Sequence, residues 1–288
     1  MAEDKQLTHL IITRYNLPFA WGRRTDIHND SDWLARRKRL FEEWCLPAVS
    51  RAMLNTDATW LVACADDSPD SLRDWMTKLE DAHPWLKPIF ISDGILDLHQ
   101  ILSTLEHEGW KLSRYILSTR LDSDDVILPH FLCSVQRVAR RCLAKSPSEE
   151  CPRTMLNFAL GFQIGATGKS YFSIHPSNAF LSILDDRLSI NGFASCYDYS
   201  HPDAFRHVTK IRQLGRPSWV QLLHGDNEGN TIAGLRIPTA HCPDIGFGLP
   251  LESRSRLKGL FADAVGVKTQ LGILLFQRTA FFASFTKR

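Results

Sequence analysis

The sequence of 288 residues lacks the features that mark several specialised classes of protein. Its seven cysteines are odd in number and include no C-x-x-C pair, which argues against a disulfide framework and a zinc knuckle. The 34 basic residues nearly balance the 32 acidic ones, so the charge gives no reason to expect a nucleic-acid partner. The densest basic run, Arg36–Arg39, is typical of a solvated helix face.

Long apolar runs are also missing. The longest, Leu271–Phe276, falls far short of the roughly 20 residues that a membrane span needs. The first ten residues carry acidic side chains where a signal peptide needs positive charge. These absences predict a cytoplasmic protein with reduced thiols. For the segment around Leu271–Phe276 we expect a core or docking helix, with a peripheral contact at the inner face of a membrane as the alternative.

What the sequence does contain is an alternation of short apolar runs and longer helical patterns, which is typical of an α/β fold with a mainly parallel sheet. The spacing predicts strands in "HLIITRY", "TWLVACADD", "KPIFISDG" and "SRYILSTRLDSDD". The helix after the first strand is expected to begin at Ser31 as N-cap and to kink or end at Pro47. After about residue 150 the pattern changes to short strands, so we expect one domain, 1–288, with an α+β elaboration over 151–288.

In an open α/β sheet, ligands bind beyond the carboxyl ends of the strands, so the polar residues at these ends are the first candidates for a site. They are Thr13, Arg14, Asn16, Asp66, Asp67, Asp93, Arg120, Asp122, Asp124 and Asp125.

The three aspartates of "LDSDD" lie within four residues, where their like charges repel one another unless a cation neutralises them or their pKa values rise. A divalent metal is the simplest solution. Hard ions such as Mg²⁺ and Mn²⁺ bind a few protein carboxylates together with water and substrate phosphate. Asp122-x-Asp124 at the end of a strand therefore predicts a metal site whose remaining ligands come from a diphosphate.

Several stretches together resemble the bacterial putative rhamnosyltransferase family, whose members are glycosyltransferases of the GT-A type. They are "TRYN", "RRKRLFEEWCLPAVSRAMLNTDATWLVACAD", "TRLDSDD" and "WVQLLHGDN", and the resemblance extends from about Leu10 to Asn230. It implies a GT-A-like, Rossmann-type nucleotide-binding sheet with helices on both faces. Residues 1–150 would form the nucleotide-sugar-binding half, and residues 151–288 the acceptor half with a C-terminal extension.

The resemblance also implies roles for individual residues. Asp122 and Asp124 match the Asp-x-Asp that holds Mn²⁺ or Mg²⁺ on the diphosphate of a UDP- or TDP-linked sugar. His224 resembles a third metal ligand. The alternative for His224 is a buried or turn residue, which is the usual role of a lone histidine outside such a motif. The other expected donor-binding residues are Thr13, Arg14, Asn16, Asp66, Arg120 and Asp125. The acceptor would be a glycan or a lipid-linked precursor.

Transfer with inversion needs a carboxylate that takes the acceptor proton. Asp185, at the end of "NAFLSILDD", is the first candidate because a strand end fixes its direction, and a turn acid paired with Arg187 is the alternative reading. Asp226 is a second candidate.

Two rival functions use the same residues. Asp-x-Asp after an apolar strand also fits the nucleophile motif of haloacid dehalogenase-like phosphatases, with Asp122 as nucleophile and Asp124 as acid and base. That motif normally follows the first strand of its fold, whereas three strand-helix units precede it here. The second rival is a non-catalytic GT-A-like module that binds a nucleotide or a glycan.

Overall fold

The computed structural model describes eleven stretches of the chain. They are residues 7–20, 23–24, 26–145, 153–165, 168–175, 178–190, 192–201, 204–208, 210–214, 216–224 and 234–237. Asp226 and the segment around Leu271–Phe276 lie outside these residues.

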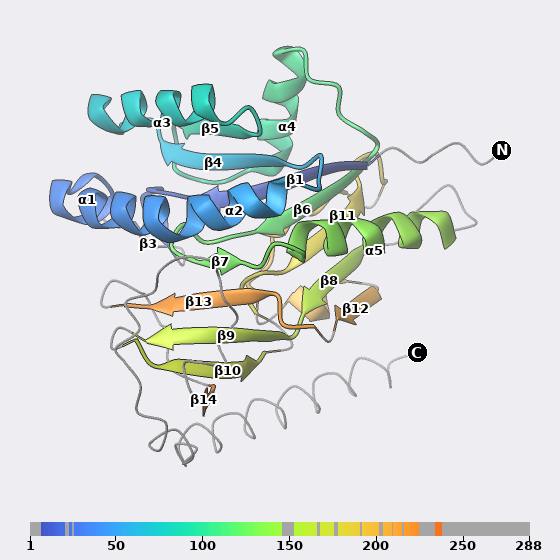
Figure 1. The fold of residues 1–288 in the computed structure, drawn as a ribbon. Helices are drawn as coiled ribbons and strands as arrows, with labels where there is room; N and C mark the ends of the chain where they lie inside the picture. The colour runs from blue at the N-terminus through green and yellow to red at the C-terminus, as the bar shows by residue number, and fades with distance from the viewer. Residues whose placement is uncertain are drawn as a thin grey trace.

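A seven-stranded sheet forms the centre of the fold (Figure 1). Its strands follow the order β12 (Lys210–Leu214), β8 (Thr154–Phe158), β11 (Ser182–Asp186), β6 (Tyr115–Arg120), β1 (Leu7–Arg14), β4 (Thr59–Ala65) and β5 (Leu86–Ile91). All neighbouring strands are parallel except β11, which runs antiparallel to both β6 and β8. The predicted α/β fold with a mainly parallel sheet is confirmed.

Helices cover both faces of this sheet, because its parallel strands are apolar on both sides. Three helices pack on one face: α2 (Leu46–Met53), α3 (Asp70–Ala82) and α5 (Phe131–Lys145). On the other face lies α4 (Leu98–His107) together with buried residues from 193–204. Successive residues of β4 show the alternation, since Trp60 belongs to the first core and Leu61 to the second.

A second sheet of five strands lies below the first in Figure 1. Its order is β14 (Leu235–Ile237), β10 (Ser170–Ile174), β9 (Leu160–Gly165), β13 (Trp219–Leu223) and β7 (Val126–Ile127). Trp219 joins this sheet to the main core: it is 2% exposed and its ring stacks on Phe180 with centroids 5.1 Å apart. The ring also lies directly against Gly161, where only a glycine fits. Four other short elements belong to the described chain: β2 (Phe19–Ala20) paired with β3 (Arg23–Arg24), and the 3₁₀ helices η1 (Asp26–Asn29) and η3 (Ala204–Arg206).

The first helical stretch passes Pro47 without ending. Helix α1 (Ser31–Leu40) continues into a π-helical turn, η2 (Phe41–Cys45), and then into α2. In this turn the N–H of Leu46 donates to the oxygen of Phe41, five residues back. The wide turn comes just before Pro47, which lacks an N–H and would crowd the carbonyl four residues back in a regular helix. The N-cap is Asp30, whose side chain accepts from the N–H of Trp33, and not the predicted Ser31.

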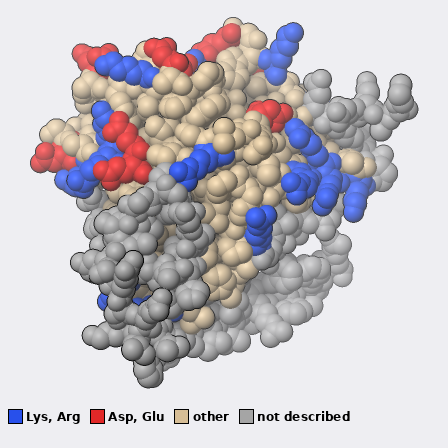
Figure 2. Space-filling model, in the orientation of Figure 1, with Lys and Arg blue, Asp and Glu red and all other residues tan. Residues whose placement is uncertain are grey.

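Acidic and basic side chains are interspersed over the face shown in Figure 2, with basic groups gathered toward α5. Four exposed residues of α5 carry that charge: Arg137, Arg140, Arg141 and Lys145. Within the described residues, no helix has both the length and the apolar character needed to cross a membrane.

Candidate active site at the carboxyl ends of the strands

The acidic loop, residues 121–125, follows β6 and is fixed by its neighbours. The N–H of Leu121 donates to the oxygen of Ile12 at 3.0 Å, and the Thr13 hydroxyl donates to the oxygen of Leu121 at 2.7 Å. On the other side, the Cys45 thiol in the π-helical turn lies 3.7 Å from the oxygen of Asp122. Because β1 and η2 both hold its backbone, the loop presents its carboxylates in a defined arrangement.

Asp125 points away from the surface and into the protein. It is 3% exposed, and its Oδ1 accepts the N–H of Leu222 on β13 at 3.1 Å. Burial and the neighbouring carboxylates of Asp124 and Asp122 raise the pKa of Asp125 well above its usual range. The side chain therefore ties the acidic loop to the second sheet, which differs from the predicted contact with the donor.

Asp122 and Asp124 face different basic side chains. Both carboxylate oxygens of Asp122 lie 3.3 Å from Nη2 of Arg120. Oδ2 of Asp124 lies 3.3 Å from Nη1 of Arg37 and 2.7 Å from Nε2 of His224. The structure thus brings together Asp124 and His224, which are 100 residues apart in the sequence and which the resemblance assigned to one metal site.

Two arginines stabilise the negative charge of Asp122. Burial alone would raise the pKa of Asp122, but the guanidinium groups of Arg120 and Arg14 more than offset this and leave its pKa below the usual value. Both guanidinium groups also lie over the ring of Tyr197, with the central carbon of Arg14 5.0 Å and that of Arg120 5.1 Å from its centroid. Asp122 is therefore an ionised acid within a cationic group of residues.

Two residues of this site were not predicted from the sequence. Arg37 belongs to the run Arg36–Arg39, which the sequence analysis assigned to a solvated face, yet Arg37 reaches Asp124. Tyr197 lies in an irregular segment without a motif. Both arrive from elements distant in sequence from the acidic loop, so only the folded chain brings them to it.

Thr13 and Asn16 are buried and do not border an open site as predicted. The Thr13 hydroxyl, besides its bond to the acidic loop, accepts from Nε1 of Trp60 at 2.8 Å. Asn16, 1% exposed, donates to Oγ of Ser68 at 3.0 Å and accepts the N–H of Ala65 at 3.1 Å. These side chains join the ends of β1 and β4, because buried polar groups need hydrogen-bond partners. Their role is to hold the strand ends that carry the site.

Asp66 and Asp67 lie at the end of β4, as predicted, and both remain accessible. The Asp66 side chain is 56% exposed and its Oδ1 lies 3.0 Å from Nη2 of Arg73. Asp67 lies 3.2 Å from Nε2 of His28, and that hydrogen bond is the main reason why its pKa is lowered. A nucleobase that forms a hydrogen bond with either carboxylate would therefore share that carboxylate with a basic side chain.

Asp185 lies at the opposite end of the main sheet. It is paired with Ile116, near the start of β6, whereas the acidic loop follows the end of that strand. Asp185 is 3% exposed, and its Oδ2 accepts from Nε of Arg153 at 2.7 Å and from the N–H of Ala194 at 2.8 Å. The expectation of a catalytic base at this position is therefore corrected: β11 runs antiparallel to β6, so its carboxyl end points away from the site. Its basic partner is Arg153 and not Arg187.

The residue types at the site suit a divalent metal, but the side chains are not arranged around a common point. Carboxylate oxygens from Asp122 and Asp124 with an imidazole nitrogen from His224 form a donor set that Mn²⁺ accepts. In the described part of the chain, however, no three such side chains converge closely enough to hold an ion. The carboxylate of Asp122 is turned to Arg120 instead. Asp122, Asp124 and His224 would hold a metal together only if the carboxylate of Asp122 turned from Arg120.

Comparison with known proteins shows which family the chain matches. The sequence profile of the family described as "Putative rhamnosyl transferase" matches residues 13–236. No curated protein sequence matches the chain.

Two solved structures are among those to which the chain is similar. One is Staphylococcus aureus TarS 1-349 in complex with UDP, with a TM-score of 0.43, 12% identity and coverage of 76% of this chain and 61% of TarS 1-349. The other is the mannosyltransferase PcManGT from Pyrobaculum calidifontis in complex with GDP-Man and Mn²⁺, with a TM-score of 0.37, 12% identity and coverage of 77% of this chain and 58% of the other. The chain thus spans about three fifths of the length of each.

Proposed function

The chain belongs to the putative rhamnosyl transferase family, and on that premise we propose that it is a glycosyltransferase that uses a nucleoside-diphosphate sugar as donor. The acceptor is a glycan or a lipid-linked precursor, and the family description names rhamnose as the sugar. We place this activity in the cytoplasm, at the inner face of the membrane where the acceptor is lipid-linked. Family membership favours this reaction over the phosphatase that an Asp-x-Asp alone would also permit.

The single observation that carries the proposal is the meeting of acidic and basic groups at the carboxyl edge of the sheet. Arg14 ends β1, Arg120 ends β6 and Arg37 reaches in from α1, while the acidic loop supplies the carboxylates. Guanidinium groups bind phosphate oxygens through paired, charge-assisted hydrogen bonds. The same edge is where open α/β sheets bind their ligands. A diphosphate is the ligand whose charge and geometry suit this group of residues.

Asp122, Asp124 and His224 would hold the divalent metal. When bound, Mn²⁺ or Mg²⁺ supplies Lewis-acid stabilisation of the charge on the leaving diphosphate. The protein's own part is to place the groups around that charge. Arg14 and Arg120 neutralise the phosphate oxygens, and Arg37 keeps the carboxylate of Asp124 oriented. For the base that takes the acceptor proton, Asp226 is the sequence candidate that we retain.

A binding panel tests the proposal. The wild-type protein is heated with UDP, TDP or GDP and with their sugars, each with and without Mn²⁺, and its unfolding temperature is recorded. A ligand present at 100 times its Kd stabilises the folded state by about 2.7 kcal/mol, which is readily measured. We expect one nucleoside diphosphate to stabilise the protein in a manner that depends on Mn²⁺.

Two variants sharpen this test. Asp124→Asn keeps the shape of the side chain but removes its charge, and should lose the stabilisation that depends on Mn²⁺. Asp81→Ala removes an exposed acid from α3 and should respond like the wild type. A full response in Asp124→Asn would contradict the metal assignment, and no response of the wild-type protein to any nucleotide would contradict the transferase itself.

A further inference from the structure

Tyr197 occupies a position that the proposed reaction does not yet explain. Its ring lies beneath two guanidinium groups, those of Arg14 and Arg120, which come from the ends of β1 and β6. The face of an aromatic ring carries partial negative charge and attracts a cation within about 6 Å of its centroid. Both arginines meet this condition. One ring therefore contacts two of the cations assigned to the donor diphosphate.

Arg14 depends on this contact more than Arg120 does. The guanidinium of Arg120 is fixed by Asp122, through contacts of 3.3 Å to both carboxylate oxygens. Within the described part of the chain, no hydrogen bond or ion pair fixes the guanidinium of Arg14. The ring of Tyr197 and the charge of Asp122 are what hold Arg14 near the site.

The segment that carries Tyr197 is itself anchored at several points. The Tyr197 hydroxyl donates to the oxygen of Ile12 on β1 at 3.3 Å. The N–H of Cys196 donates to Oγ of Ser118 on β6 at 2.9 Å. Further back, the N–H of Ala194 donates to Asp185 at 2.8 Å. The ring is thus held against the same two strands that carry the arginines, which is the arrangement expected of a support and not of a loosely placed loop residue.

Asp185 gains a role from this arrangement. Its carboxylate holds Ala194 and also Nε of Arg153, while Nη1 of Arg153 donates to the Tyr199 hydroxyl at 2.8 Å and Nη2 to the oxygen of Gly192 at 2.7 Å. The buried ion pair therefore fastens both ends of residues 192–199. Asp185 thus lies too far from the site for proton transfer, but it supports the segment that carries Tyr197 to the site.

We propose that Tyr197 is a positioning residue that sets the guanidinium groups of Arg14 and Arg120 for the diphosphate of the donor. This inference rests on the proposed function, since it names the part of the donor that the two arginines meet. It assigns to Tyr197 no contact with the reacting atoms. Its effect should appear in phosphate recognition and leave recognition of the nucleoside unchanged.

The test compares binding of a nucleoside diphosphate with binding of the free nucleoside. Using the nucleotide that stabilises the wild-type protein in the panel, for example UDP against uridine, Kd is measured by calorimetry in the presence of Mn²⁺. Tyr197→Leu removes the ring and should raise the Kd for the diphosphate about tenfold, a typical size for cation-π contacts at a partly desolvated site. The Kd for the nucleoside should stay within about twofold. Tyr197→Phe keeps the ring and should bind both ligands nearly as the wild type does.

Two further variants separate this role from a general loosening of the segment. Tyr199→Leu removes a neighbouring ring that stacks on His207 and the hydroxyl that accepts from Arg153, so it loosens the segment but leaves the ring of Tyr197 in place, and it should not weaken diphosphate binding selectively. If Tyr197→Leu does not fold, phenylalanine analogues with increasing ring fluorination at position 197 weaken the cation-π attraction at constant shape, and diphosphate affinity should fall step by step.

The outcomes are distinct. A selective loss of diphosphate affinity in Tyr197→Leu, or with fluorination, supports the inference. Unchanged diphosphate affinity, or an equal loss in Tyr199→Leu, overturns it while leaving the proposed function intact. If the wild-type protein binds no nucleoside diphosphate, the proposed function fails and this inference fails with it.

Discussion

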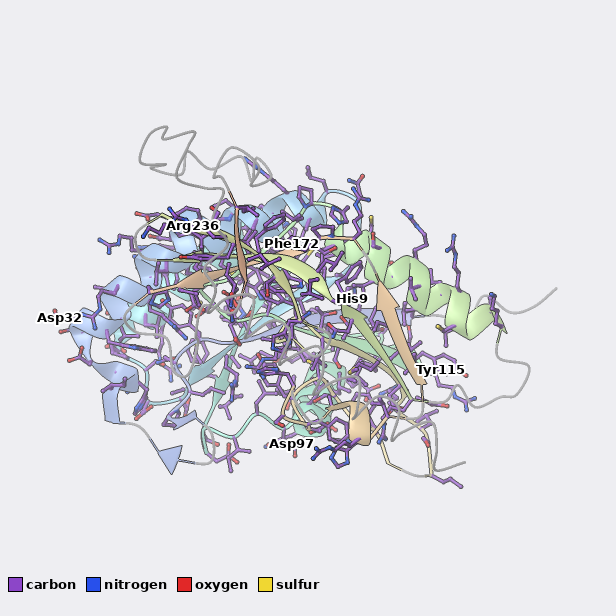
Figure 3. All side chains as sticks on the ribbon, turned by 90° about the horizontal axis from the view of Figure 1, so that it is seen from below. His9, Asp32, Asp97, Tyr115, Phe172 and Arg236 are labelled. Carbon is purple, nitrogen blue, oxygen red and sulfur yellow. The ribbon has the colours of Figure 1, made fainter. Side chains whose placement is uncertain are left out.

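Replacing His9 should change how the stability of the protein depends on pH. His9 lies on β1 inside the molecule, where it is 2% exposed (Figure 3). Its Nε2 lies 2.8 Å from Oγ1 of Thr119, which in turn lies 2.7 Å from Oγ of Ser182, so the contact chain crosses three strands. Burial lowers the pKa of His9 to about 3, because a charged imidazole would lose its hydration there.

The size of the effect follows from this pKa. In the unfolded chain a histidine has a pKa of about 6.5, so between about pH 6.5 and pH 3 the unfolded state binds a proton that the folded state does not. Through this interval the free energy of unfolding falls by up to about 1.4 kcal/mol for each unit of decreasing pH. Above it, His9 has no effect on the pH dependence. Between pH 7 and pH 5, His9 alone should therefore remove about 2 kcal/mol of stability.

Urea unfolding of the wild-type protein and of His9→Gln at pH 7, 6 and 5 measures this contribution. Glutamine does not titrate, so the variant should lose less stability on acidification, by about 2 kcal/mol over this range. His107→Gln serves as the matched control because His107 is exposed on α4. Parallel pH dependences for the wild type and His9→Gln would refute the reasoning, since they would mean that His9 accepts a proton equally in both states.

Two other substitutions should lower the free energy of unfolding. In Gly161→Ala the new Cβ would come within 2.1 Å of the buried Trp219 ring, so we expect the free energy of unfolding measured in urea to fall by about 2 to 3 kcal/mol. Wild-type stability in this variant would show that the ring can move. Thr13→Val removes the hydroxyl that binds the acidic loop and Trp60, and should cost about 1 to 3 kcal/mol, whereas Thr77→Val on the exposed face of α3 should change little. Equal losses in the two threonine variants would argue against a special role for Thr13.

The first half of the fold was predictable because it follows from local patterns. Each of the four apolar runs expected as strands is a strand, β1, β4, β5 and β6, and the helical patterns between them are helices. The order of these strands and the antiparallel course of β11 depend on contacts between distant segments. "TMLNFALGFQI" shows the difference clearly: this mainly apolar stretch contains no proline and forms two strands, β8 and β9, which separate at Ala159 and join different sheets. Both strands are mostly buried and similar in composition, so composition does not reveal the break.

The chemistry of the candidate site was more predictable than the direction of its side chains. Strand ends identified Arg14, Arg120 and the acidic loop, but they identified Thr13 and Asn16 equally well, and these two turn inward. A polar side chain at a strand end faces either a ligand or a buried partner, and the partner is provided by another strand. Arg37 was missed for the opposite reason, because a run of four basic residues gave no sign that one of them reaches the loop.

The π-helical turn before Pro47 sets the angular phase of the two helices that it joins. Arg37 and Cys45 are eight residues apart, and in a regular helix of about 3.6 residues per turn they would project about 80° apart. By absorbing one extra residue, the wide turn brings the two projections to within about 20° of each other. Both side chains can then meet the acidic loop, the arginine at Asp124 and the thiol at the backbone of Asp122. One residue added to a helix thus works as a rotational offset that aligns a charge on α1 with a backbone support at the end of η2.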